Sequence, residues 1–189
     1  IASGLMFGCH GAQKLFGAFG GHGGNPGATA KLFTLIWFGG VIELVGVEPS
    51  LRMHRLALKR SRAARLPVEM VGITAEKLPL ADAVFDTVVS TYTLCTIPDP
   101  VAALREVRRV LAPGGRLLFS EHGRAPDANV LKWQSRLQPY WSKLAGGCML
   151  DRDIPAILKE AGFDPQVQSM YIPGPRIVSY HYWGEAVAV

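Results

Sequence analysis

The feature that most constrains the fold is a regular alternation of short apolar runs and longer helical stretches, which begins near residue 45. Strands are predicted at 44–47, 68–73, 85–91 and 116–120, and helices at 50–64, 100–111, 129–143 and 153–161. Strands that alternate with helices are typical of a parallel sheet. Two later runs, 166–171 and 180–189, are predicted to close this sheet as an antiparallel pair. The pattern therefore predicts an α/β fold.

The first 47 residues differ in composition from the rest of the chain. They contain 12 of the 21 glycines and only three charged side chains, those of Lys14, Lys31 and Glu43. Two apolar runs, 1–7 and 32–47, flank the glycine-rich part. A membrane-spanning helix needs about 20 mostly apolar residues, so the second run is marginal for this role, and the first run is expected to have lost its beginning. The expected division is into residues 1–46 and 47–189, and the first residue, Ile1, leads us to expect a chain truncated at its start.

Charge and cysteine content exclude several functional classes. The net charge of +5 is modest for 189 residues and predicts no nucleic-acid partner. Cysteines occur at 9, 95 and 148 without a C-x-x-C pair, so no disulfide framework and no metal site is expected. Cys95 and Cys148 are expected to be small buried apolar side chains. This cysteine usage is typical of a reduced, cytoplasmic protein.

Polar residues follow the first two predicted strands. Val45-Gly-Val-Glu48-Pro49-Ser50 places a carboxylate at a strand end, where ligands bind in open α/β sheets and where it can accept hydrogen bonds from both ribose hydroxyls. The alternative is a surface glutamate before a turn. Ala75 and Glu76 follow the next strand, where they either meet an adenine edge or form a solvated loop.

The next two predicted strands also end in polar residues. The run 85–91 leads into a polar tip at Ser90, Thr91 and Tyr92. The segment 111–122 begins Leu-Ala-Pro-Gly-Gly and ends Ser-Glu-His, so that Glu121 and His122 close a strand. Since parallel strands end at one edge of the sheet, the four motifs define one predicted nucleoside site.

In this order, the motifs Glu-Pro, Ala-Glu-x-Leu-Pro, Phe-Asp-x-Val-Val and Leu-x-Pro-Gly-Gly resemble class I S-adenosylmethionine-dependent methyltransferases, from about residue 46 to the end. The segments Phe119-Ser-Glu-His and Gly147-Cys-Met-Leu are similar to a branch that includes alkyl-thiol methyltransferases. The resemblance implies S-adenosylmethionine as cofactor and a small thiol or other lipophilic molecule as methyl acceptor. It further implies that the cofactor is bound by Glu48, Pro49, Ser50, Ala75, Glu76, Ser90, Thr91 and Tyr92.

His122 is the candidate catalytic residue. A thiol must lose its proton to attack a methyl group, and histidine is a suitable base because its ordinary pKa lies near neutral pH. The alternative is a structural histidine that is hydrogen-bonded to the backbone.

The first part of the chain resembles a different family. Phe7-Gly-Cys-His-Gly-Ala-Gln-Lys-Leu-Phe-Gly, followed by Ile42-Glu-Leu-Val-Gly, is similar to the start of DoxX proteins, which are small four-helix membrane proteins. This resemblance covers about residues 1–46. It implies an apolar helical segment and membrane association through residues 1–46.

No G-x-G-x-G turn precedes Glu48. The predicted fold is therefore an incomplete Rossmann-like class I methyltransferase sheet, without its first strand and glycine-rich loop, preceded by a short apolar helical segment. We interpret the chain as a chimeric fragment that joins two unrelated coding segments, with impaired cofactor binding. The alternatives are a membrane-anchored DoxX-like module and an inactive hybrid.

Overall fold

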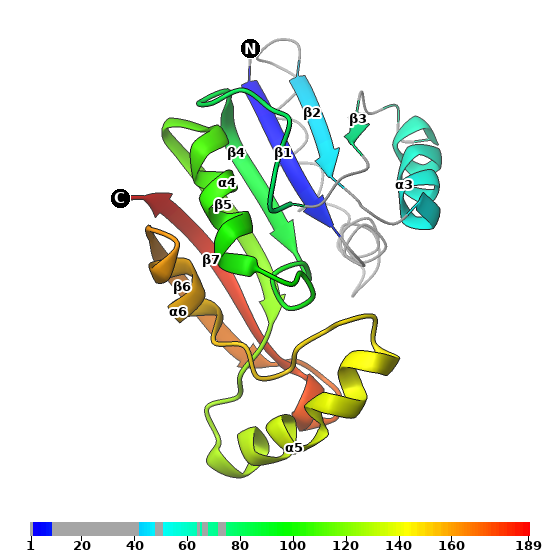
Figure 1. The fold of residues 1–189 in the computed structure, drawn as a ribbon, viewed down its shortest axis with the longest axis vertical. Helices are drawn as coiled ribbons and strands as arrows, with labels where there is room; N and C mark the ends of the chain where they lie inside the picture. The colour runs from blue at the N-terminus through cyan, green and yellow to red at the C-terminus, as the bar shows by residue number, and fades with distance from the viewer. Residues whose placement is uncertain (1, 9–41, 48–50, 64, 66–67, 72–74) are drawn as a thin grey trace.

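A seven-stranded sheet forms the centre of the molecule. The computed structural model describes residues 2–8, 42–47, 51–63, 65, 68–71 and 75–189 (Figure 1). The strand order is β3-β2-β1-β4-β5-β7-β6. The first five strands of this order pair in parallel, and β7 pairs antiparallel with both β5 and β6.

Strand β1 (Ala2–Gly8) lies in the middle of the sheet, between β2 and β4. The expected absence of a first strand is thus wrong, and so is the expected helical conformation for residues 2–8 and 42–46. Strands buried in parallel sheets are continuous apolar runs, and hydrophobic periodicity does not distinguish a short run of this kind from a helix. The parallel pairing of Leu5 with Val45 and Val88 determines the strand conformation.

Most other predicted elements are confirmed, and their ends agree within a few residues. Their ends were predictable because turn residues bound the apolar runs. The strands are β2 (Ile42–Val47), β3 (Val68–Val71), β4 (Phe85–Thr91), β5 (Leu111–His122), β6 (Phe163–Tyr171) and β7 (Tyr180–Ala188). The helices are α3 (Leu51–Ala63), α4 (Pro100–Val110), α5 (Ala128–Leu144) and α6 (Ile154–Glu160), with a short 3-10 helix η1 (Arg176–Val178). Gly114 lies inside β5, where the pairing with β4 shifts its register.

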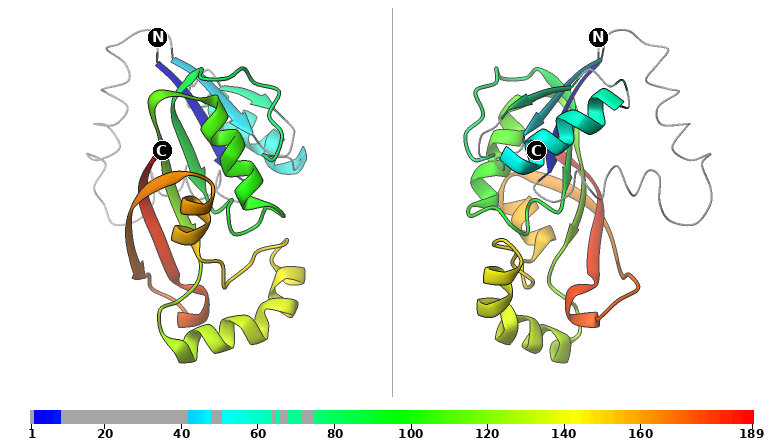
Figure 2. Two further views of the ribbon diagram at one scale, coloured as in Figure 1. Left: turned by 60° about the vertical axis from the view of Figure 1, so that its left-hand side comes forward. Right: turned by 90° about the vertical axis from the view of Figure 1, so that its right-hand side faces the viewer.

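Helices pack on the sheet and at one end of it (Figure 2). Leu104 of α4 and Leu158 of α6 are fully buried in the same core as Val88 and Leu117 of the sheet. Helix α5 lies beyond the carboxyl ends of β4 and β5 (Figure 1). Within the described residues, no helix combines the length and apolar character that crossing a membrane requires.

Glu106 of α4 anchors the segment that follows β3. Its carboxylate accepts a hydrogen bond from the backbone N–H of Leu78 at 2.9 Å and two from the guanidinium of Arg109. Arg109 in turn donates to the backbone carbonyls of Leu78 and Leu80. This network fixes the backbone at Leu78 and Leu80, a few residues after Ala75. The Arg109 hydrogen bond lowers the pKa of Glu106, and burial opposes this effect.

Replacing Glu106 with glutamine is expected to lower the free energy of unfolding by about 1.5–3 kcal/mol near neutral pH, the usual contribution of a hydrogen bond to a charged group. Since folding lowers the pKa of Glu106, its contribution is present above the unfolded-state pKa and is lost as the pH falls through the folded-state value. Urea unfolding from pH 7 to pH 3 therefore shows the wild type and the variant converging at low pH. The exposed Glu160 is the control, and an equal loss in Glu160→Gln contradicts the assigned role.

Candidate functional site

The carboxyl ends of the central strands meet at one edge of the sheet. Gly8, the last residue of β1, lies opposite Thr91, the last residue of β4. The backbone N–H of Tyr92 donates to the carbonyl of Ser120 in β5 at 3.0 Å. The strand order reverses between β1 and β4, and ligands of open α/β sheets bind at such a switch point. The predicted residues Ser90, Thr91 and Tyr92 therefore lie at the edge of the sheet where the strand order reverses.

Glu121 joins the ends of β4 and β5. Its Oε1 accepts hydrogen bonds from the Ser90 hydroxyl at 2.9 Å and from the Thr93 N–H at 3.0 Å. The residue is fully buried, and burial raises the pKa of Glu121 to about 7 against the opposing effect of these hydrogen bonds. Within the described residues, its Oε2 has no hydrogen-bond partner. The carboxyl group thus holds the turn after β4 in place.

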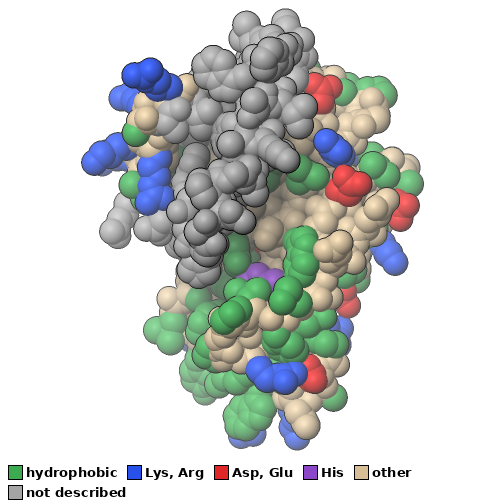
Figure 3. All heavy atoms as spheres, turned by 180° about the vertical axis from the view of Figure 1, so that it is seen from behind, with side chains coloured by type: hydrophobic (Ala, Val, Ile, Leu, Met, Phe, Trp, Pro, Cys, Tyr) green, Lys and Arg blue, Asp and Glu red, His purple; other side chains and the backbone are tan. Residues whose placement is uncertain are grey.

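Tyr92, His122 and His181 form an aromatic cluster beside Glu121. The Tyr92 ring stacks on the His122 ring with centroids 6.2 Å apart, and its hydroxyl lies 2.7 Å from His181 Nε2. His181 Nδ1 lies 3.0 Å from the Ser179 carbonyl, so Nδ1 is the protonated nitrogen and Nε2 accepts the Tyr92 proton. Burial raises the pKa of Tyr92. Figure 3 shows histidine side chains at the bottom of a hollow that apolar side chains border.

His122 also contacts two cysteines from distant parts of the chain. Its Nε2 lies 3.0 Å from the Cys148 sulfur, and the ligand atoms of Cys95, His122 and Cys148 all lie within 4.8 Å of one another. A hydrogen bond from the Cys95 thiol lowers the pKa of Cys148 to about 4, and His122 lowers it further. The same hydrogen bond raises the pKa of Cys95. Both cysteines are buried, as expected, yet their neighbours are polar. Their wide spacing in the sequence carries no signal of this proximity.

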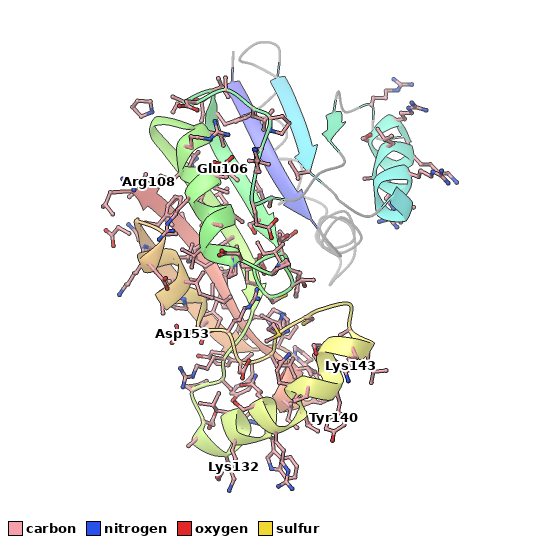
Figure 4. The ribbon with its side chains drawn as sticks, in the orientation of Figure 1. Glu106, Arg108, Lys132, Tyr140, Lys143 and Asp153 are labelled. Carbon is pink, nitrogen blue, oxygen red and sulfur yellow. The ribbon has the colours of Figure 1, made fainter. Side chains whose placement is uncertain are left out.

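Helix α5 holds the loops of the site with two buried glutamines one turn apart. Gln134 accepts a hydrogen bond from the Ala125 N–H at 2.9 Å and donates to the Gly123 carbonyl at 3.1 Å. Gln138 donates to the Cys148 carbonyl at 3.1 Å. The opposite side of the helix carries exposed residues such as Lys132 and Tyr140 (Figure 4). Neither glutamine was predicted from the sequence as a site residue, although their spacing of four on a predicted helix is a usable signal.

The remaining predicted cofactor residues lie in two places. Ala75 is buried and Glu76 is half-buried, next to the segment that Glu106 fixes. Glu48, Pro49 and Ser50 lie outside the described residues, directly after β2. The segment in which a glycine-rich loop would follow β1 also lies outside them. The expectation of impaired cofactor binding relied on a missing first strand and a missing glycine-rich loop. Strand β1 is present, so the first of these premises is wrong and the impairment is unsupported. The division into residues 1–46 and 47–189 stays a prediction, although strands from both parts pair in one sheet.

Comparison with known proteins connects this geometry to one family. A family model described as a methyltransferase domain matches residues 22–119. Thiol S-methyltransferase TMT1B of Rattus norvegicus is 40% identical over 112 residues, which cover 57% of this chain and 46% of that protein. The ubiquinone/menaquinone biosynthesis C-methyltransferase UbiE of Klebsiella pneumoniae is 38% identical over 103 residues, or 54% of this chain and 41% of that protein. The chain thus spans about half the length of the curated relatives it matches.

Solved structures agree on the fold. A SAM-dependent methyltransferase from Methanosarcina mazei superposes with a TM-score of 0.66 at 18% identity, covering 97% of this chain and 91% of that one. A SAM-dependent methyltransferase from Aquifex aeolicus gives a TM-score of 0.60 at 16% identity, covering 100% and 82%. The matched region begins at residue 22, inside the segment compared with DoxX, and neither these findings nor the fold supports a DoxX-like membrane segment. The chain therefore belongs to the methyltransferase domain family, with the Rossmann-like class I fold and S-adenosylmethionine as its cofactor.

Proposed function

We propose that the protein transfers a methyl group from S-adenosylmethionine to the sulfur of a small thiol. The observation that carries this proposal is the buried polar cluster at the ends of β4 and β5, where Tyr92, Glu121 and His122 lie together beside two cysteine sulfurs. Relatives named thiol S-methyltransferases, at about 40% identity over part of the chain, support the same acceptor class.

The described residues fit the cofactor at the strand ends. Ser90 and Thr91 offer polar groups where β4 ends opposite Gly8, and Ala75 with Glu76 lies beyond β3 on the adenine side. Glu48, Pro49 and Ser50, which follow β2 directly, are proposed to hold the ribose. When bound, the cofactor supplies an electrophilic methyl group on a sulfonium. The residues of the chain hold it at the switch point and limit the access of water to the acceptor.

His122 is proposed to promote the loss of the acceptor proton. It is 7% exposed at the end of β5, and within the described residues its Nδ1 has no hydrogen-bond partner. A buried polar nitrogen without a partner is unfavourable for folding alone, which favours a role in binding or chemistry. Its ring orientation is fixed by Tyr92 on one face and by Cys148 at Nε2.

Labelled methyl transfer tests the acceptor class. The protein is incubated with S-adenosylmethionine carrying a labelled methyl group and with a matched set of acceptors: an alkyl thiol, the corresponding alcohol and amine, and a quinol. The expected product is a labelled methyl thioether from the thiol alone, identified by mass spectrometry. Methylation of the quinol or the amine in preference to the thiol would overturn the assignment.

A further inference from the structure

Cys95, His122 and Cys148, here called the Cys-His-Cys trio, have the composition of a metal site. Their ligand atoms all lie within 4.8 Å of one another, and all three residues are buried. A tetrahedral Zn²⁺ ion with bonds of about 2.3 Å to sulfur and about 2.0 Å to nitrogen places two sulfur ligands and one nitrogen ligand about 3.5–3.8 Å apart. Small rotations of the three side chains therefore suffice to hold one ion.

The loops that carry the two cysteines are fixed to each other without any ion. The backbone N–H of Met149 donates to the Cys95 carbonyl at 2.7 Å, and Gln138 donates to the Cys148 carbonyl. Arg152 donates to the Ile97 carbonyl at 2.7 Å and so holds the loop after Cys95. Ligands that are ordered in advance lose little conformational entropy when an ion binds.

The surroundings of the trio suit two thiolates and a divalent ion. The indole N–H of Trp141 donates to the Cys148 sulfur at 3.4 Å, and the Thr96 hydroxyl lies 3.4 Å from the Cys95 sulfur. Such outer hydrogen bonds orient sulfur ligands. Two thiolates also balance the charge of Zn²⁺, so the occupied site adds no net charge to a buried region, where an unbalanced charge is costly.

We propose that the Cys-His-Cys trio binds Zn²⁺ and leaves a fourth coordination position for the sulfur of the acceptor thiol. This inference rests on the proposed function, because it specifies how the same site activates its acceptor. When a thiol binds, its S–H bond breaks, the proton goes to solvent water, and the sulfur electron pair forms the bond to the ion without any redox change. Two cysteines and one histidine with an open position form a known type of catalytic zinc site. His122 then promotes proton loss as a ligand.

Cobalt is a spectroscopic probe for this site. The full chain is reduced, freed of metal with a chelator and titrated with Co²⁺. A single equivalent is expected to bind with the visible bands of tetrahedral cobalt and a thiolate-to-metal charge-transfer band. Residues that only hydrogen-bond to a metal ligand already contribute about 10–100-fold to metal affinity. Loss of a ligand itself is therefore expected to weaken cobalt binding by at least about 100-fold in each of the variants Cys95→Ser, Cys148→Ser and His122→Asn.

His181 provides the matched control, because its ring lies 6.2 Å from that of His122 but outside the trio. His181→Asn is expected to retain the cobalt spectrum. X-ray absorption of the unmutated, zinc-loaded protein needs no variant and is expected to show two sulfur ligands and one imidazole. A cobalt complex without a thiolate band, or one that survives in Cys148→Ser, overturns the proposed site.

Methyl transfer separates this inference from the proposed function. Thiol methylation at an undiminished rate by the metal-free protein overturns the metal proposal and leaves the proposed function intact. Metal binding by the trio without thiol methylation by the zinc-loaded protein overturns the proposed function, and with it the role of the fourth coordination position.

Discussion

Replacing Gly184 with alanine is expected to lower the free energy of unfolding by at least about 3 kcal/mol, the upper range for overpacked sites. A Cβ atom at this position would lie 1.9 Å from the backbone carbonyl oxygen of Gln166. Gly184 pairs with Val167 in β6 and with Phe119 in β5, so the backbone cannot move away without breaking pairing on one side. The free energy of unfolding of a domain is only about 5–15 kcal/mol, so this single methyl group is expected to destabilise the antiparallel pairing of β5, β7 and β6 substantially. Urea unfolding followed by circular dichroism measures the loss.

Gly114→Ala is the matched control. Its φ of +79° disfavours alanine, but apart from its two chain neighbours no described residue has an atom within 4 Å of the added Cβ. The expected loss is therefore limited to the backbone cost of about 1–2 kcal/mol. An equal loss in the two variants would contradict the argument, because it would assign the effect at Gly184 to backbone conformation rather than to the contact with Gln166.

Sequence patterns predicted the parallel sheet well where apolar runs are bounded by turn residues. The predicted strand at 85–91 coincides with β4, and the late antiparallel pair corresponds to β6 and β7. Strand β1 was missed because its apolar run is short and is followed by glycine-rich sequence that favoured comparison with a membrane protein. Only pairing on both sides, with β2 and β4, determines its structure, and such pairing is not encoded in local periodicity.

The candidate site was predictable only where it depends on strand ends. Because parallel strands end at one edge, sequence order alone placed Tyr92 near His122, and their rings do stack. Cys148 comes from the loop after α5, and its approach to His122 depends on how α5 packs across the sheet end through Gln138. The spacing of Cys148 and His122 in the sequence does not predict their contact, since this contact arises from tertiary packing.

Replacing His122 with asparagine is expected to reduce the rate of thiol methylation by roughly 10²–10⁴-fold, the usual contribution of a group that assists proton transfer. The residue lies between Tyr92 and Cys148, on the proposed acceptor side of the site, whereas Ala75 and Glu76 lie on the proposed adenine side. The dissociation constant of S-adenosylmethionine is therefore expected to stay unchanged. Single-turnover rates with an alkyl thiol and calorimetric titration of the cofactor measure the two quantities separately.

Lys132→Asn supplies the control, because Lys132 is exposed on the outer side of α5 (Figure 4). It is expected to leave both quantities at wild-type values. A residue that promotes proton loss matters less when the thiol is already ionised, so the deficit of His122→Asn is expected to shrink as the pH rises toward the pKa of the acceptor thiol. A structural histidine would instead weaken cofactor binding and methylation together at every pH, and that result would remove His122 from the chemistry.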